Sequence, residues 1–144
     1  MDIQEIDHLT ENFYQCISFN KERYPNVYKL KELFYGVGKL INHNFEYPIE
    51  YTVDSFSQSL MAQIETGDAF YFAQQEISDN TEIFGNVAQR ISVYEHSPLN
   101  YPLQEWKRGI NYIHYVKVNG KWLITSMVWQ DEKEEVKIPE VYLV

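Results

Sequence analysis

Residues Arg108 to Glu132 read RGINYIHYVKVNGKWLITSMVWQDE, and they decide the fold because two β-branched and aromatic runs meet at Asn119-Gly120. Asn-Gly between two such runs is typical of a two-residue type I′ turn. This stretch therefore predicts an antiparallel hairpin. The expected pairs are Val118–Lys121, Tyr115–Ile124, His114–Thr125, Tyr112–Met127 and Ile110–Trp129.

This register divides the hairpin into two faces, and both are largely apolar. The first face carries Ile110, Tyr112, His114, Val116, Leu123, Thr125, Met127 and Trp129. The second carries Asn111, Ile113, Tyr115, Trp122, Ile124, Ser126 and Val128. A strand pair with one side in water would alternate apolar and charged residues, so both faces should be covered. We expect helices on the first face and a homodimer through the second, which would be the outer face of the sheet.

Length and composition indicate one soluble domain, residues 1–144. The aromatic share is 16%, including 12 Tyr, which favours broad sheets and aromatic-lined cavities. A net charge of −9 would repel a phosphate backbone or an anionic bilayer, so we expect no nucleic-acid partner and no membrane partner. The single cysteine, Cys16, cannot form an internal disulfide, and no signal-like or membrane-spanning apolar run is present. These features predict a cytoplasmic protein.

Periodicity places the remaining elements. Asp2 and Glu5 begin a helix that is predicted to end near residues 21–24, and a short helix is expected over residues 27–34. A bent strand over residues 33–44 and a loop over 46–51 follow, then a helix capped by Thr52 and ended by Gly67. Two strands follow, with a turn expected at residues 78–81. The order predicts an α+β fold, in which a curved antiparallel sheet wraps around the N-terminal helices and leaves a cone-shaped hollow.

The chain resembles the nuclear transport factor 2-like (cystatin-like) superfamily, near its SnoaL-like branch. The resemblance is carried by the element order, by VAQRISVYE (87–95), by RGIN (108–111) and by GKWLITSMVWQDE (120–132), and it spans essentially the whole chain. Because the superfamily contains isomerases, dehydratases, cyclases and association domains, the resemblance implies a fold and no single function. Its ketosteroid isomerase-like members use an Asp base on or just after the first strand. This chain has KLINHNF (39–45) there and offers no carboxylate, so His43 is the candidate that could replace it as a base.

The predicted ligand pocket combines the first hairpin face with the third predicted strand. Its wall is formed by Tyr112, His114, Met127 and Trp129, and its polarity comes from Arg90 and Tyr94. His114 is the other catalytic candidate. The alternatives stay open: a core histidine that bonds to Tyr or Thr, a surface His43, and an Arg90 that pairs with Glu76 or Glu95.

Two functions therefore remain. The first is a SnoaL-like domain that binds a small hydrophobic or aromatic molecule, as a carrier or as an isomerase, dehydratase or cyclase. The second is a non-catalytic dimerisation or interaction module of the same fold. No cofactor or metal is expected, since the histidines at 8, 43, 96 and 114 lie in unrelated elements and 131–135 is predicted to be a solvated acidic strand end. The apolar segment after it, 136–144, is expected to dock on the body of the domain through Ile138, Val141, Tyr142 and Leu143.

Overall fold

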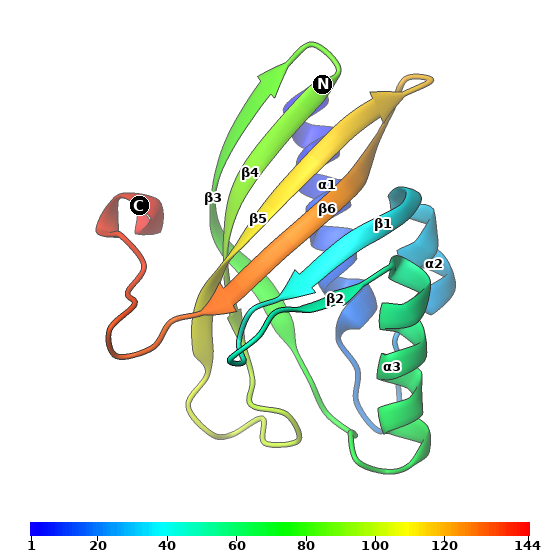
Figure 1. The fold of residues 1–144 in the computed structure, drawn as a ribbon, viewed down its shortest axis with the longest axis vertical. Helices are drawn as coiled ribbons and strands as arrows, with labels where there is room; N and C mark the ends of the chain where they lie inside the picture. Colours follow the sequence, from blue (N-terminus) through cyan, green and yellow to red (C-terminus); the bar gives the residue numbers. More distant parts are fainter.

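The predicted hairpin is formed by β5 (Lys107–Val118) and β6 (Lys121–Asp131), which lie in the middle of the sheet in the computed structural model of residues 1–144. The sheet has six strands in the order β2-β1-β6-β5-β4-β3 (Figure 1). Asn119 and Gly120 have φ of 52° and 78°, as a type I′ turn requires, and Val118 pairs with Lys121. The turn prediction is confirmed.

The predicted register holds only for the half of the hairpin nearest the turn. Tyr115 pairs with Ile124, but His114 pairs with Ser126, because a β-bulge places one extra residue, Thr125, in β6. From that point the pairs predicted for His114, Tyr112 and Ile110 are wrong by one residue. The bulge has a direct consequence for the two faces: Trp122 and Ile124 before it and Met127 after it are all buried on the same side.

The first strand joins the sheet in a way that the sequence did not indicate. β1 (Phe34–Asn42) runs parallel to β6, and β2 (Ile49–Tyr51), predicted as a loop, pairs antiparallel with β1. The sheet is therefore mixed rather than wholly antiparallel. The predicted bend in this strand is present, with positive φ at Gly36 and Gly38 and a register shift between Phe34 and Lys39.

The other long hairpin consists of β3 (Gln74–Phe84) and β4 (Val87–His96). The turn expected at residues 78–81 is wrong, since those residues pair with β4 throughout and the chain reverses at Gly85-Asn86. A shift between Glu76 and Ser78 bends β3 and preserves the pairing on both sides of it.

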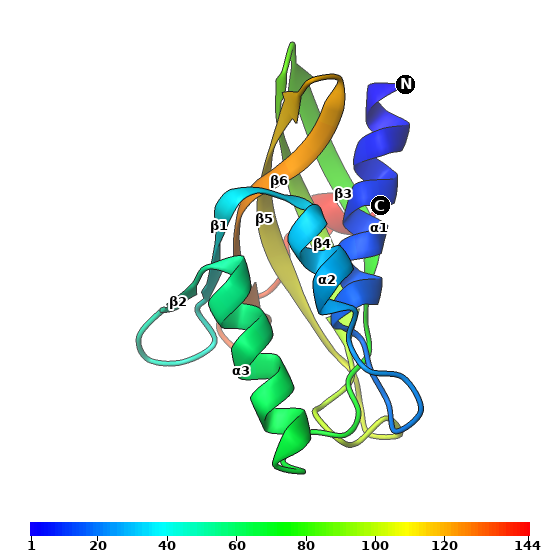
Figure 2. The same ribbon diagram turned by 90° about the vertical axis from the view of Figure 1, so that its right-hand side faces the viewer.

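The three α-helices lie on one side of this sheet (Figure 2). α1 (Asp2–Ile17) ends earlier than predicted, because Ser18 leaves the helix and donates from its hydroxyl to the Tyr14 carbonyl. α2 (Val27–Glu32) is short, and α3 (Val53–Glu65) is capped by Thr52 as predicted. Lys31 of α2 pairs with Asp54 of α3 at 3.3 Å.

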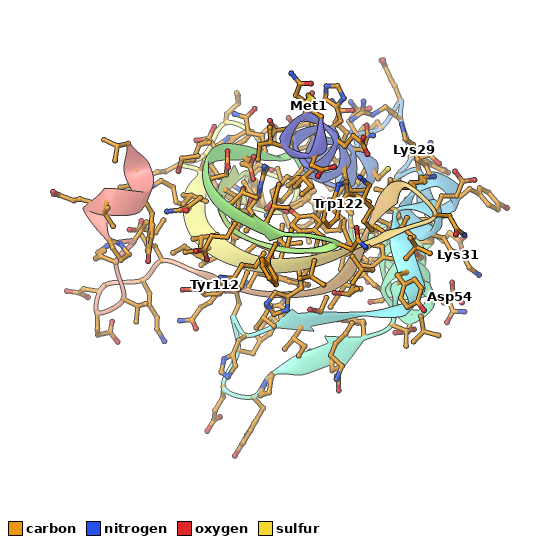
Figure 3. The ribbon with its side chains drawn as sticks, turned by 90° about the horizontal axis from the view of Figure 1, so that it is seen from above. Met1, Lys29, Lys31, Asp54, Tyr112 and Trp122 are labelled. Carbon is orange, nitrogen blue, oxygen red and sulfur yellow. The ribbon has the colours of Figure 1, made fainter.

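The main core lies between α1 and the concave face of the sheet. Figure 3, a view from above, shows Trp122 on the side that faces α1 and Tyr112 on the opposite, convex side. The buried apolar residues of β5 and β6 are Ile113, Tyr115, Trp122, Ile124 and Met127. Four of the residues from which a dimer face was predicted, Ile113, Tyr115, Trp122 and Ile124, are thus core residues, and that part of the prediction is wrong.

The C-terminal segment folds back onto the convex side. Its 3-10 helix η1 (Glu140–Leu143) contacts β3 and β4, and the Ser78 hydroxyl donates to the Tyr142 carbonyl at 2.5 Å. Ile138 is buried, whereas Val141 is 67% exposed, so the docking predicted for these two residues is right for the first and wrong for the second. None of the helices has the length and apolarity needed to span a bilayer.

Candidate ligand-binding site

A cavity of about 220 Å³ lies at the open end of the cone, where α1 and α3 approach the ends of β4 and β6. Its apolar wall comes from both helices, from β6 and from the loop before β3. The residues of this wall include Phe13, Ile17, Phe56, Leu60, Phe72 and Trp129. The volume exceeds the roughly 150 Å³ of an apolar cavity that accepts benzene, so one or two aromatic rings can fit.

Aromatic rings hold the shape of the wall. The ring of Phe56 lies edge-on to those of Tyr51 at 5.5 Å and Trp129 at 6.3 Å between centroids. Such edge-to-face pairs are stabilising and restrict ring rotation. α3 thereby keeps Trp129 in place at the cavity, and the first turn of α3 is itself fixed by the Thr52–Ser55 capping box.

Three polar side chains meet at one side of the cavity: Tyr94, His96 and Asp131. The Tyr94 hydroxyl donates to Asp131 Oδ1 at 2.6 Å, and His96 Nε2 lies 3.0 Å from Asp131 Oδ2. His96 Nδ1 lies 2.7 Å from the carbonyl oxygen of Ser97. Because a carbonyl and a carboxylate can only accept, both ring nitrogens carry hydrogen, and His96 is an imidazolium paired with a carboxylate.

The pKa values of this group agree with that assignment. Burial opposes both charges, but the hydrogen bond and charge of Asp131 raise the pKa of His96. In return, His96 and Tyr94 lower the pKa of Asp131 against the same burial effect. Burial and the nearby carboxylate raise the pKa of Tyr94 far above its usual range. The pair is charged, and neither member is a free proton acceptor.

Asn111 is a fourth polar residue of the cavity lining and is only 2% exposed. Its Nδ2 lies 3.4 Å from the Tyr14 hydroxyl and 3.5 Å from Met127 Sδ. Its Oδ1 is buried and has no hydrogen-bond partner within the protein. A buried acceptor without a partner is uncommon and costly, so this atom marks a place where a ligand atom would be stabilising.

Arg90 is fully buried and does not line this cavity, so it does not supply the pocket polarity that was predicted for it. Its Nε donates to Thr81 Oγ1 at 2.7 Å, its Nη1 donates to Glu76 Oε1 at 3.0 Å, and its Nη2 contacts Asp7 of α1 and Asp79. All three nitrogens are therefore occupied by protein groups. Of the two sequence-level alternatives for Arg90, the pair with Glu76 is the one present.

The predicted pocket wall is divided between the two faces of the sheet. Tyr94 and Trp129 line the cavity, and Met127 is buried directly behind Asn111. Tyr112, which is 52% exposed, and His114 lie on the convex face, so the prediction that they share a wall with Met127 and Trp129 is wrong. The cause is the bulge at Thr125. It moves Met127 and Trp129 of β6 to the opposite face of the sheet, while the residues of β5 keep their faces. His43 is exposed and does not line the cavity.

Sequence reasoning missed His96, Asp131 and Asn111. Asp131 was predicted to be a solvated strand end, which is wrong, since its side chain is only 18% exposed and is paired with His96. A signal did exist: alternation along β4 placed Tyr94 on the inner face, and His96 is the next residue on that face. The chain contains no group of three or more His, Cys, Asp or Glu side chains arranged to hold a metal.

Comparisons with known proteins support the fold. No protein-family model and no curated protein matches the chain. A structure of a cystatin-like fold protein of unknown function from Nostoc punctiforme superposes with a TM-score of 0.69 at 16% identity, over 92% of each chain. Hexachlorocyclohexane dehydrochlorinase LinA-type3 from Novosphingobium barchaimii superposes with a TM-score of 0.70 at 10% identity, over 92% of this chain and 87% of that one.

A third similar structure comes from Exiguobacterium sibiricum and bears the name of the calcium/calmodulin-dependent kinase II association domain. It has a TM-score of 0.59 at 13% identity, over 92% of each chain. Together with the solved proteins that are called NTF2-like, these structures establish the nuclear transport factor 2-like, cystatin-like α+β fold. The likeness concerns the fold alone, and the SnoaL-like branch stays a prediction.

Proposed function

We propose that this protein binds a small aromatic molecule in the cavity between α1, α3 and the ends of β4 and β6. The observation that carries the proposal is the cavity itself: about 220 Å³ that the protein's own aromatic side chains line but do not fill. A cone used only as a scaffold gains stability when its interior is packed, because empty apolar volume is destabilising. An open interior with aromatic walls and a few polar groups is typical of a ligand site.

Ligand binding is better supported than catalysis. Isomerases, dehydratases and cyclases need a group that accepts or donates a proton. His96 and Asp131 are the cavity's ionisable pair, and the His96 Nε2 proton is already donated to Asp131. The dehydrochlorinase that shares the fold is an enzyme, but its 10% identity carries no site residue over to this chain.

The test is to fill the cavity by substitution. Leu60→Trp places a large ring in the space that the ligand would use, whereas Leu103→Trp adds the same ring at a residue that is 99% exposed. Calorimetric titration with naphthalene in a low fraction of co-solvent should show saturable binding to the wild type and to Leu103→Trp and no binding to Leu60→Trp. Equal binding to all three proteins, or to none, would refute the proposal.

A second function, self-association through the convex face, is favoured by a specific observation. Tyr112 and Val128 are 52% and 39% exposed there, and Ile110 and Leu123 are only partly covered. The three α-helices lie on the other face, and the C-terminal segment only borders these residues, through residues 136–138 and Tyr142. One of the proteins with the same fold is named for a kinase association domain, which adds support. We therefore propose a homodimer through this face, in which Val128 is retained from the face first predicted and Tyr112, Ile110 and Leu123 replace its other residues.

A further inference from the structure

We infer that the cavity selects a ligand that donates a hydrogen bond, through an O–H or N–H group, to Asn111 Oδ1. The inference rests on the proposed function and adds the class of ligand. Its basis is a chain of hydrogen bonds that begins at the buried Arg90, passes through Glu76, Ser92 and Tyr14, and ends at the amide nitrogen of Asn111, a residue of the cavity lining. Each bond in this chain can run in only one direction.

The first bond sets that direction. Arg90 Nη1 donates to Glu76 Oε1 at 3.0 Å, and an arginine is always protonated in proteins. Burial raises the pKa of Glu76, but the Arg90 charge and the hydrogen bonds from Ser92 and Arg90 oppose that effect and favour the carboxylate, which can only accept hydrogen bonds. Ser92 Oγ lies 2.5 Å from Glu76 Oε2, so the single proton of the Ser92 hydroxyl points toward Glu76.

The second and third bonds follow from the first. Ser92 Oγ also lies 2.8 Å from the Tyr14 hydroxyl, and since Ser92 has used its proton, Tyr14 must be the donor. With its own proton committed to Ser92, the Tyr14 oxygen can only accept from Asn111. The atom that faces Tyr14 at 3.4 Å is therefore the amide nitrogen Nδ2, and the alternative orientation of the amide is excluded.

The last step concerns what remains of the Asn111 amide. One Nδ2 hydrogen is directed to Tyr14 and the other to Met127 Sδ at 3.5 Å, so both donors have partners in the core. Oδ1 has none, although the residue is 2% exposed and lines the cavity. A ligand with a donor group completes this acceptor, while a ligand that presents an oxygen acceptor there would be repelled.

Indole and benzofuran form the probe pair, because they have nearly the same shape and differ in an N–H group against an ether oxygen. Calorimetric titration of the wild type should show that indole binds with an affinity about tenfold higher than benzofuran does. Indole satisfies the buried acceptor, whereas benzofuran leaves it without a partner. Asn111→Leu removes the acceptor and keeps the branching and the number of heavy atoms of the side chain. In that variant the ratio of the two affinities should fall to about one.

Ser92 and Tyr14 are positioning residues, because they fix the orientation of the Asn111 amide. The ratio of the indole and benzofuran affinities tests this role more specifically than the affinity for either ligand alone. Ser92→Ala breaks the chain between Glu76 and Tyr14, so Tyr14 is free to donate to Asn111 and the amide can reverse. The ratio should drop toward one although indole still binds. Tyr115→Phe is the matched control: it deletes another buried hydroxyl, which bonds to Thr10 outside this chain, and it should keep the wild-type ratio.

The outcomes separate the two claims. Equal affinities of the wild type for indole and benzofuran, or tighter binding of benzofuran, would overturn the donor rule while leaving ligand binding intact. A ratio that Ser92→Ala does not change would overturn the chain as its cause. Failure of the folded wild type to bind indole, benzofuran and naphthalene would overturn the proposed function and this inference with it.

Discussion

His96 at the end of β4 and Asp131 at the end of β6 form an ion pair, with Nε2 3.0 Å from Oδ2, across the intervening strand β5. The imidazolium also donates to the Ser97 carbonyl, and Asp131 accepts from Tyr94. The backbone N–H of Asp131 donates to Asn44 Oδ1 at 2.6 Å, which ties the same point to the loop after β1. One partly buried charge pair thus connects three parts of the cavity rim.

The first prediction is a pH-dependent stability that depends on His96. The pKa of His96 is raised in the folded protein. Its contribution to the unfolding free energy is therefore complete below the ordinary pKa of 6.5, and it is lost as the pH rises through the folded-state pKa. The pKa of Asp131 is lowered, so its pH dependence runs the opposite way. The contribution of Asp131 to the unfolding free energy is complete above the ordinary pKa of 3.8 and is lost as the pH falls. The difference in unfolding free energy between the wild type and His96→Gln should therefore be largest between pH 3.8 and 6.5.

Urea denaturation at a series of pH values measures this difference. His8→Gln, which replaces an exposed histidine of α1, is the matched control and should follow the wild-type curve at every pH. A wild-type advantage over His96→Gln that grew above neutral pH would contradict the charged-pair assignment.

Local sequence signals predicted the elements of this fold better than the faces they present. Asn119-Gly120 determined a turn that the structure has, and Thr52 and Gly67 marked the ends of α3. The bulge at Thr125 has no such signal, since Thr is an ordinary strand residue. Because both hairpin faces are apolar, alternation could not tell which one lies under α1.

The candidate site was less accessible from the sequence for a related reason. Its residues come from many parts of the chain. The packing of α1 on the sheet, the parallel pairing of β1 with β6 and the packing of α3 on β1 bring the apolar wall to the polar residues of β4, β5 and β6. Asn111 stands among aromatic residues in β5 and has no local pattern to distinguish it. Its importance appears only when its two amide atoms are traced to their partners.

The second prediction concerns the docked C-terminal segment. Ile138 is 7% exposed and its N–H donates to Glu132 Oε2 at 2.9 Å, so Ile138→Ala should lower the unfolding free energy by about 2 kcal/mol through lost burial. Val141→Ala, at a residue that is 67% exposed, should change it by less than about 0.5 kcal/mol. Thermal denaturation of the two variants measures both effects, and equal shifts would contradict docking through Ile138.

The third prediction concerns self-association through the convex face. A dimer would have twice the 17.2 kDa mass of the chain in light scattering at micromolar concentration. Tyr112→Asp should convert it to a monomer, because a carboxylate at the centre of an apolar interface has no partner. Tyr28→Asp places the same charge on a residue of α2 that is 85% exposed, and it should remain a dimer. A monomeric wild type would exclude this interface.

The fourth prediction is that Arg90 stabilises the fold through its charge and its geometry together. Its side chain is completely buried, while its partners Glu76 and Asp7 are 21% and 50% exposed. Arg90→Ala leaves Glu76 partly buried without a counter-charge and should cost about 3 kcal/mol of unfolding free energy. Arg90→Lys should recover only part of that loss, because one ammonium group cannot reach Thr81, Glu76 and Asp7 as the planar guanidinium does.

Arg108→Ala, which breaks the more exposed pair with Glu132, should cost less than about 1 kcal/mol. Urea denaturation orders the three variants, and a cost for Arg90→Ala as small as that for Arg108→Ala would show that Arg90 is not needed to hold α1 against β3 and β4.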